Sequence, residues 1–386
     1  MNKRAFFDPT FKLGILGGGQ LGKMLCQVTS RWALHTAVLD TSRDFPAGQV
    51  CSEFVEGDFT DYNDVVEFGK QMDVVTIEIE RVNSAALNTL KQQGTIVHPD
   101  PGALDIIKDK GLQKQFYDHQ GLPTTPHQLF AGKNEIENAV GAGSLKLPFV
   151  VKARKDGYDG RGVHIVRTEQ DLAECFDAAC LVEPLLELER EVSVIVARNQ
   201  RGEIKSFPPV GMEFHPTANL VEYLYCPAGI GSSIAQEAIQ IAQATAESLD
   251  MCGLLAVEMF VTTDGQLLIN EVAPRPHNSG HHTIEACSVS QFEQHLRAIL
   301  DLPLADVTLR SPAVMINILG SPGHEGPARY NGLEQCIGIV GVSLHLYGKS
   351  TTKPFRKMGH ATIVAPRLEQ AIETAKFVRS TISVTA

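Results

Sequence analysis

The sequence contains 386 residues, of which 43% are hydrophobic and 20% are charged, so it predicts a globular protein with two or three domains. Its formal net charge of −11 argues against a general attraction to nucleic acids or anionic membranes, so any phosphate must be bound at a local site. The eight cysteines form no C-x-x-C pair, no run of about 18 apolar residues occurs, and the apolar pair near the start ends at Asp8-Pro9. We therefore expect reduced thiols and a cytoplasmic protein with no zinc site, signal peptide or membrane span.

A strand, a glycine-rich turn and a helix are predicted at the start of the chain. Residues 12–16 (KLGIL) predict the strand, the run GGGQLG at 17–22 satisfies G-x-G-x-x-G, and a helical stretch continues to about residue 33. A second strand at 36–39 ends in Asp40, close to where a dinucleotide-binding fold places the acid that binds ribose. Alone, this pattern indicates NAD. Such a turn aims backbone N–H groups at any phosphate, however, so a phosphorylated substrate fits equally well.

Alternating helices and strands continue to about residue 100 and predict a doubly wound parallel α/β sheet. Glu78 and Glu80 lie on one face at the end of a strand, where open α/β sheets bind ligands, although a solvated edge fits the spacing equally well. Pro99-Asp100-Pro101 then opens a helix expected to reach about residue 119. The other expected elements are a helix at 61–70, a strand at 74–79, a helix at 83–92 and a strand at 95–97.

A glycine-rich hairpin is predicted in the middle of the chain. The apolar run 149–151 leads into Lys152, and a second apolar run begins at Val163. Glycines in the loop let backbone N–H groups approach a polyphosphate, and Lys152 supplies a fixed charge, although a plain surface hairpin has the same pattern. The strand at 181–184 leads into a segment of the kind that presents backbone groups to an adenine base, or simply ends there. The loop contains Arg154, Lys155, Gly157, Gly160, Arg161 and Gly162.

Two acids are predicted to face each other in a second hairpin. Asp264-Gly265 between strands at 254–261 and 266–270 predicts a two-residue loop, and counting outward from it places Glu258 opposite Glu271. Directly paired residues have Cβ atoms about 5 Å apart, so two carboxylates there need a cation. Oxygen ligands facing a phosphate loop favour Mg²⁺, to which Asn270 could add an oxygen, unless this is a surface hairpin with unrelated acids. The polar run 273–282 that follows is expected to contact a substrate.

Lys152, the glycine loop, the segment from Glu183, the acids Glu258 and Glu271, and the run NEVAPRPHNSGH together resemble the ATP-grasp superfamily, and within it the ATP-dependent carboxylases of purine biosynthesis. The likeness extends over nearly the whole chain through ILGGGQLGKM, TIEIE, KDGYDGRG and YGKSTTKPFRKMGHATI. It implies an ATP-grasp fold of mixed α/β and α+β class, usually in a homodimer. The expected domains are a Rossmann-like N-terminal α/β domain at 1–110, an ATP-grasp domain at 111–303 and a small β-rich C-terminal domain at 304–386.

The resemblance also implies a reaction and its residues. ATP and bicarbonate would give carboxyphosphate and ADP, and the 5-amino group of aminoimidazole ribonucleotide would then be carboxylated. Mg²⁺ would be held by Glu258 and Glu271, and catalysis would involve Lys152, Arg161, Arg275 and His277. The implied ATP contacts are Lys110, Lys152, Gly157, Tyr158, Asp159, Gly160, Arg161, Gly162, Val163, Glu183, Pro184, Leu185, Leu186, Glu191, His215, Asn270 and Glu271. The implied ribonucleotide contacts are Gly19, Gln20, Glu78, Tyr158, Arg161, Arg275, His277, Asn278, Ser279, Lys349, Arg356 and Lys357.

Two positions depart from this family pattern, since many relatives have Arg where this chain has Lys110, and His where it has Arg81. On the family interpretation, the first glycine loop would hold the 5′-phosphate of the ribonucleotide, with cations from the C-terminal domain. The alternatives are an NAD-dependent dehydrogenase, a nucleotide sensor without turnover, and a formate-using glycinamide ribonucleotide transformylase.

Overall fold

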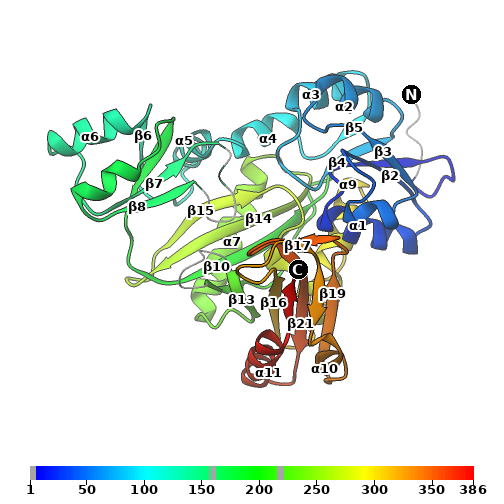
Figure 1. Cartoon of the computed structure of the whole chain (residues 1–386). Coiled ribbons are helices and arrows are strands. Elements are labelled where there is room, and N and C mark those ends of the chain that lie inside the picture. The colour runs from blue at the N-terminus through cyan, green and yellow to red at the C-terminus, as the bar shows by residue number, and fades with distance from the viewer. Residues whose placement is uncertain (1–5, 156, 158–161, 215–220) are drawn as a thin grey trace.

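The computed structural model describes residues 6–155, 157, 162–214 and 221–386. In Figure 1, the blue N-terminal unit lies at one end of the molecule and a lobe that contains β7 and β8 lies at the other. A long sheet that includes β10 and β14 lies between them and continues into the orange and red C-terminal region. In the part of the chain that is described, no helix is both long and apolar enough to cross a membrane.

The N-terminal unit is a parallel sheet in the order β3-β2-β1-β4-β5, covered by helices on both faces as predicted. Along β1, Leu13 and Ile15 pack against α1 and α9, whereas Leu16 lies in the core formed with α2 and α3. Helix α9 comes from the last third of the chain, so a distant segment of the sequence completes this core. The strands are β1 (Lys12–Leu16), β2 (His35–Asp40), β3 (Glu53–Glu56), β4 (Val74–Ile77) and β5 (Ile96–Val97). The helices are α1 (Gln20–Arg31), α2 (Tyr62–Gly69), α3 (Ser84–Gln92) and α9 (Gln291–Ile299).

The single helix predicted from residue 101 is wrong, because the chain forms α4 (Pro101–Ile107) and then α5 (Lys110–Gln120). Asp109 separates them, and its carboxylate accepts the free N–H groups of Gly111 and Leu112 at the start of α5. The break directs α5 away from the first sheet and toward the middle of the molecule. The strand predicted at 74–79 is also shorter, so Glu78 and Glu80 lie just beyond the end of β4.

The lobe contains an antiparallel sheet in the order β6-β9-β7-β8. The predicted glycine-loop hairpin is confirmed, since β7 and β8 pair with Lys152 opposite Val163. Its strands are β6 (Gln128–Phe130), β7 (Phe149–Ala153), β8 (Val163–Val166) and β9 (Cys180–Pro184), and its helix is α6 (Lys133–Gly141).

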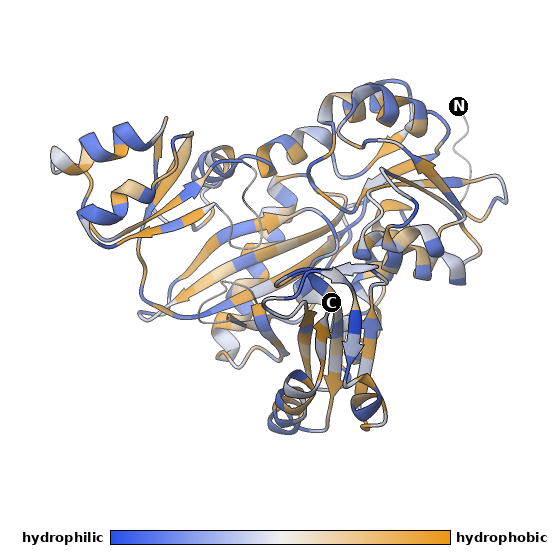
Figure 2. Cartoon of the chain, in the orientation of Figure 1, coloured by the Kyte–Doolittle hydropathy of each residue, from blue (hydrophilic) through white to orange (hydrophobic). Residues whose placement is uncertain are grey.

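The central sheet has the order β15-β14-β10-β12-β13-β16-β21-β19, with β11 paired to β10. Alternate residues of β10 and β14 pack against α7 on one face and near α9 on the other, which explains the apolar stretches within the strands of this sheet in Figure 2. The strands are β10 (Leu188–Arg198), β11 (Ile204–Ser206), β12 (Val210–Phe214), β13 (Val221–Cys226), β14 (Gly253–Thr262) and β15 (Leu267–Ala273). The helices are α7 (Ser232–Ser248) and α8 (Thr283–Ala286).

The C-terminal region joins the same sheet, because β16 pairs with both β13 and β21. The domain boundary predicted after residue 303 therefore does not interrupt the sheet. Helix α11 packs on β16 and β21. The elements are β16 (Ala313–Leu319), β17 (Gly326–Pro327), β18 (Arg329–Asn331), β19 (Val342–Leu346), β20 (Thr351–Thr352), β21 (Lys357–Val364), β22 (Ser383–Thr385), α10 (Leu333–Ile337) and α11 (Leu368–Thr381).

A buried histidine connects the N-terminal sheet to the central sheet. His295 of α9 accepts the backbone N–H of Leu254 at Nδ1 over 3.2 Å, so its proton is on Nε2, which donates to Thr76 Oγ1 over 3.0 Å. Leu254 belongs to β14 and Thr76 to β4. Burial, with a smaller effect of His98, lowers the pKa of His295 to about 3. The imidazole is therefore a neutral link between the two sheets.

Acidification should weaken this link. The unfolded chain protonates His295 near pH 6.5 and the folded chain only near pH 3, so its contribution to stability is complete above pH 6.5 and decreases as the pH falls. Each proton that the unfolded state binds and the folded state does not changes the free energy of unfolding by about 1.4 kcal/mol per pH unit. In urea unfolding measured from pH 7 to pH 4.5, His295→Gln should show a pH slope smaller by about one proton. An unchanged slope would contradict a neutral His295.

Candidate active site

The first glycine loop holds an internal carboxylate. Glu78 accepts the backbone N–H groups of Gly19, Leu21 and Gly22 over 3.0, 3.1 and 3.0 Å, at the N-terminus of α1. A Cβ on Gly19 would lie 2.7 Å from Glu78 Oε1, so the close approach of the carboxylate requires glycine here. Burial raises the pKa of Glu78, although the N–H groups of Gly22 and Gly19 oppose this.

These N–H groups are the ones that the sequence led us to assign to a phosphate. Asp40, the candidate ribose-binding acid, likewise accepts the N–H of Gly18 over 2.7 Å. The expectation for this loop is corrected, because the chain itself supplies the anions at this helix N-terminus. The same contacts remove the basis of the NAD interpretation.

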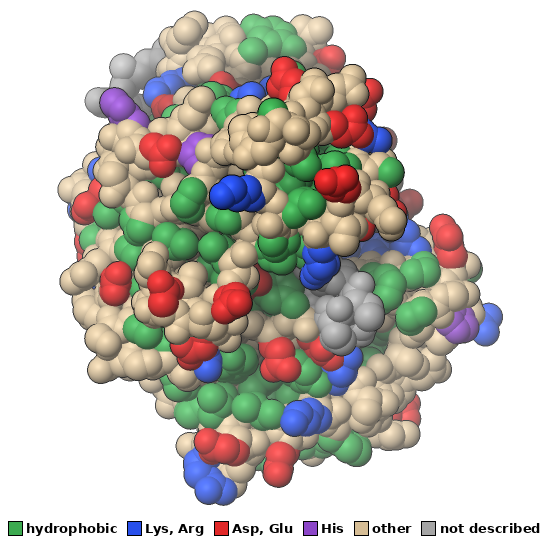
Figure 3. Space-filling view, turned by 90° about the vertical axis from the view of Figure 1, so that its left-hand side faces the viewer, with side chains coloured by type: hydrophobic (Ala, Val, Ile, Leu, Met, Phe, Trp, Pro, Cys, Tyr) green, Lys and Arg blue, Asp and Glu red, His purple; other side chains and the backbone are tan. Residues whose placement is uncertain are grey.

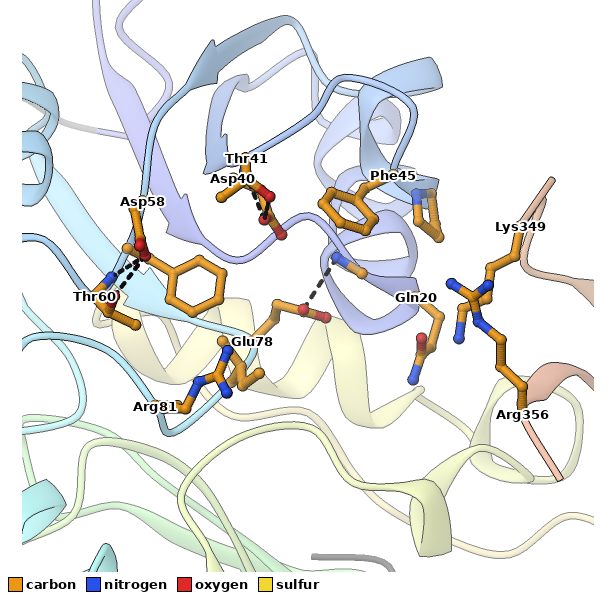
Figure 4. A pocket seen from close by; sticks show the side chains of 14 residues that line it. Gln20, Asp40, Thr41, Phe45, Asp58, Thr60, Glu78, Arg81, Lys349 and Arg356 are labelled. Atoms are coloured by element: carbon orange, nitrogen blue, oxygen red, sulfur yellow. Dashed lines mark hydrogen bonds between the residues drawn. The ribbon is translucent and has the colours of Figure 1, made fainter. Parts of the chain in front are cut away.

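A cavity of about 590 Å³ opens beside Glu78, between the N-terminal and C-terminal regions. Figure 4 shows Glu78 in the middle of the cavity, with Gln20, Lys349 and Arg356 to one side and Arg81 to the other. Lys349 and Arg356 come from the loops between β19 and β21. A ligand with an anionic group at one end and a hydrogen-bonding group in the middle would match this arrangement.

The cavity brings together five of the predicted ribonucleotide residues and adds residues that were not predicted. The predicted ones are Gly19, Gln20, Glu78, Lys349 and Arg356. Within the described part of the chain, its lining does not include Arg275, His277, Asn278, Ser279 or Lys357. The additional lining residues are Asp40, Thr41, Phe45, Pro46, Asp58, Phe59, Thr60, Ile79 and Arg81.

The pairing of Glu258 with Glu271 across β14 and β15 is confirmed, but the predicted turn is wrong. Thr262 pairs with Gln266, so the loop has three residues, and Gly265 has the positive φ of +85° that such a loop needs. A β-bulge compensates, because Met259 lies opposite Ile269 whereas Glu258 lies opposite Glu271. The extra residue is Asn270.

The bulge places Asn270 toward the glycine-loop hairpin, where its Oδ1 accepts a hydrogen bond from Lys152 Nζ over 2.8 Å. Lys152 also forms an ion pair with Glu183, with 2.6 Å between Nζ and Oε2. Lys152 of β7 thus contacts the predicted nucleotide residues Glu183 of β9 and Asn270 of β15.

The two paired acids have opposite pKa shifts. Lys110 forms an ion pair with Glu271 and holds its pKa below the usual range. Burial, together with the charges of Glu271 and Glu191, raises the pKa of Glu258. Burial also raises the pKa of Glu191 to about 7. The repulsion of Glu258 by Glu271 and Glu191 exceeds its attraction to Lys110 and Lys357, and this favours a further cation.

These donors fit Mg²⁺ that is completed by a nucleotide. Glu258 and Glu271 supply carboxylate oxygens and Asn270 an amide oxygen, which are ligands that Mg²⁺ accepts. Among the described residues, no group of three or more His, Cys, Asp or Glu side chains could hold a metal unaided. Phosphate oxygens and water would have to complete the coordination.

The polar loop after β15 contacts the N-terminal region, the acid pair and strands β10 and β16. Arg275 forms an ion pair with Glu80 of the N-terminal region, with 2.8 Å between Nε and Oε1. His277 Nε2 lies 3.5 Å from Glu258 Oε1. Asn278 donates over 2.9 Å to Asn317 of β16. The buried Ser279 contacts both His277 and Ser193, at 2.9 Å each.

The remaining predicted residues flank the nucleotide site. Gly162 has a φ of +77° just before Val163 begins β8, and Glu191 lies in β10. Pro184 ends β9, and Leu185 and Leu186 connect it to β10. Gly157 is described, but Tyr158, Asp159, Gly160, Arg161 and His215 lie outside the described residues.

Sequence reasoning did not predict the partners of three charged residues of the site. Glu80 was expected beside Glu78 at the ligand-binding end of a strand, but its ion pair with Arg275 was not predicted. Asp109 receives two hydrogen bonds of 2.8 Å from Arg154 at the base of the glycine loop. Lys114 lies 2.6 Å from Glu183 and is only 2% exposed. A usable signal existed for Lys114 alone, which follows Lys110 by four residues on one helix.

Comparison with known proteins gives the same three-part organisation. Residues 10–108 match the ribonucleotide synthetase preATP-grasp domain, residues 115–292 the ATP-grasp domain, and residues 313–374 the phosphoribosylaminoimidazole carboxylase C-terminal domain. The N5-carboxyaminoimidazole ribonucleotide synthase of Bacillus subtilis is 35% identical over 94% of each chain. The chloroplastic phosphoribosylaminoimidazole carboxylase of Vigna aconitifolia is 38% identical over 92% of this chain, which spans only 64% of that relative.

Comparison with solved structures leads to the same family. The N5-carboxyaminoimidazole ribonucleotide synthetase of Thermotoga maritima matches with a TM-score of 0.89 and 39% identity, over 97% of this chain and 99% of that one. The Aspergillus clavatus synthase in complex with ADP and 5-aminoimidazole ribonucleotide matches with a TM-score of 0.88 and 32% identity, over 96% and 98%. The fold is thus an ATP-grasp domain between a preATP-grasp domain and a small C-terminal domain, and the chain belongs to the N5-carboxyaminoimidazole ribonucleotide synthase family.

Proposed function

We propose that the chain catalyses the ATP- and bicarbonate-dependent carboxylation of the 5-amino group of 5-aminoimidazole ribonucleotide in purine biosynthesis. The observation that carries this proposal is the loop from Arg275 to Ser279, which contacts the acid pair through His277 and the N-terminal region through Glu80. This segment therefore connects the nucleotide site to Glu80, which lies between the cavity residues Ile79 and Arg81. The Aspergillus clavatus relative, whose structure contains ADP and this ribonucleotide, supports the identity of the two ligands.

ATP is assigned to the cluster around β7, β9 and β15. Lys110 and Lys152 would neutralise phosphate charge, while Glu258 and Glu271, with Asn270, would hold Mg²⁺. When bound, the metal would reduce repulsion between the γ-phosphate and bicarbonate, both of which are anions. The protein's own contribution is to align the two reactants and keep water away.

The ribonucleotide is assigned to the cavity beside Glu78. Its 5′-phosphate would lie near Lys349 and Arg356, and its aminoimidazole ring nearer to Glu78. Arg81, where relatives often have His, would lie on the far side of the ring. The assignment keeps the phosphate away from the glycine loop, whose N–H groups are donated to Glu78.

The proposed reaction has two steps. A bicarbonate oxygen attacks the γ-phosphorus, the bond to the β-phosphate oxygen breaks, and ADP leaves with carboxyphosphate formed. The amine then bonds to the carboxyl carbon, the carbon–oxygen bond to phosphate breaks, and phosphate and one amine proton are released.

The homodimer, the cytoplasmic location and the domain boundaries at 110 and 303 stay predictions. On the face drawn in Figure 3, acidic and basic side chains are interspersed, which does not favour a nucleic-acid surface.

The function is tested by ADP release with each candidate substrate. Aminoimidazole ribonucleotide with bicarbonate should give rapid ADP formation, and omission of either should slow it by about 100-fold or more. Glycinamide ribonucleotide with formate should remain at the background rate. ADP formation with the formate pair, or equal rates without bicarbonate, would overturn the proposal.

The acid pair is tested by Glu271→Gln. Loss of this charge removes one Mg²⁺ ligand and leaves Lys110 without its partner, so turnover should fall by about 100-fold or more. The fold should persist, because the change also relieves repulsion with Glu258. Asp264→Asn, at the tip of the same hairpin, is the matched control and should keep normal turnover. Near-normal activity of Glu271→Gln at saturating Mg²⁺ would disprove the metal assignment.

A further inference from the structure

Lys114 is a buried charged residue to which the proposed reaction gives no role. It lies on α5 and is among the largest fully buried side chains, with 2% exposed. Its Nζ lies 2.6 Å from Glu183 Oε1, and it donates to Thr124 Oγ1 over 2.6 Å and to the Ile269 carbonyl over 3.3 Å. The ammonium therefore donates two hydrogen bonds, to Thr124 and Ile269, and forms an ion pair with Glu183.

Glu183 lies between two lysines. Lys114 contacts one of its oxygens and Lys152 the other, each at 2.6 Å, and Glu183 itself is only 3% exposed. Burial alone would raise the pKa of Glu183, but Lys152 and Lys114 keep it below the usual range. Without the second lysine, the buried carboxylate would depend on Lys152 alone for its counter-charge.

The contact with Ile269 brings Lys114 to the bulge. Ile269 precedes Asn270, the extra residue of β15, and its carbonyl also accepts the Thr124 hydroxyl over 2.9 Å. Lys114 therefore contacts both the strand that bears Glu183 and the strand that bears Asn270 and Glu271. One ammonium fixes the two strands relative to each other.

We propose that Lys114 is a positioning residue for the nucleotide site, which supplies the counter-charge of Glu183 and thereby leaves Lys152 available to the phosphates of ATP. When a phosphate approaches, Lys152 can exchange its contact with Glu183 for the phosphate, because Lys114 remains beside the carboxylate. Lys114 itself does not contact ATP. The inference rests on the proposed ATP site.

The test replaces Lys114 by the nearly isosteric but uncharged methionine. Lys114→Met should weaken binding of ADP with Mg²⁺, measured by calorimetry, by about tenfold or more, because Glu183 then holds Lys152. The apparent KM for aminoimidazole ribonucleotide should stay within about twofold, since its proposed site lies elsewhere. Lys108→Met is the matched control, because Lys108 donates to Val82 and Ser84 in the N-terminal region. The control should bind ADP normally.

A second substitution separates charge balance from simple packing. In Lys114→Met/Glu183→Gln the carboxylate charge is also removed, so Lys152 is released and ADP affinity should recover at least about fivefold relative to Lys114→Met. If Lys114 only supports the fold, the double variant should bind as weakly as the single variant or more weakly. That result would overturn the inference.

Two further outcomes are decisive. If Lys114→Met does not fold, Thr124→Val removes one partner of the ammonium and should weaken ADP binding about threefold, whereas unchanged affinity would contradict the inference. If the wild-type protein does not bind ADP with Mg²⁺, the proposed function fails. If the wild-type protein and Lys114→Met bind equally well, only the role of Lys114 fails.

Discussion

Two carboxylates that face each other across β14 and β15 determine the arrangement of the surrounding charges. Glu258 and Glu271 are directly paired, and like charges at that separation destabilise a sheet. The chain brings Lys110 from α5 to one of them and His277 from the polar loop to the other. Lys152 reaches the adjacent Asn270 from the glycine-loop hairpin. Segments far apart in the sequence therefore meet where a cation and a polyphosphate would be needed.

The N-terminal unit shows how one internal contact changes the use of a common fold. Its parallel sheet and glycine turn are those of a dinucleotide-binding domain, but Glu78 and Asp40 take the N–H groups that would bind a phosphate. The helix N-terminus then fixes a carboxylate at the edge of the cavity. In the proposed site, the cations for a phosphate would come instead from the C-terminal region, through Lys349 and Arg356, which line the cavity.

Much of the fold could be predicted because local patterns determine it. Alternating apolar runs predicted the N-terminal sheet. The glycine-rich loop after Lys152 predicted one hairpin, and Asp264-Gly265 predicted the other. The three-residue turn and the bulge at Asn270 could not be predicted, since each shifts the pairing by one residue and the two shifts cancel at Glu258. The break between α4 and α5 was not predicted, because the capping of α5 by Asp109 leaves the apolar pattern of the sequence unchanged.

The site divides in the same way. Lys152, Glu258 and Glu271 were visible in local motifs, whereas most other roles came from resemblance to a family. Contacts between distant segments were missed, as in the pairs Glu80–Arg275 and Lys114–Glu183, because a local pattern does not show which residue of another segment a side chain contacts. Complementary charges in a chain of this length allow too many pairings to choose among without the fold.

The central claim is that this site phosphorylates bicarbonate, and transfer of an oxygen isotope tests it most directly. During turnover with ATP, aminoimidazole ribonucleotide and ¹⁸O-labelled bicarbonate, the bicarbonate oxygen that attacks the γ-phosphorus leaves with phosphate when the carbon–oxygen bond breaks. Mass spectrometry of the released phosphate should therefore find one ¹⁸O atom for each ADP formed. Phosphate that carries no label from bicarbonate, or that takes its oxygen from labelled water instead, would contradict the account.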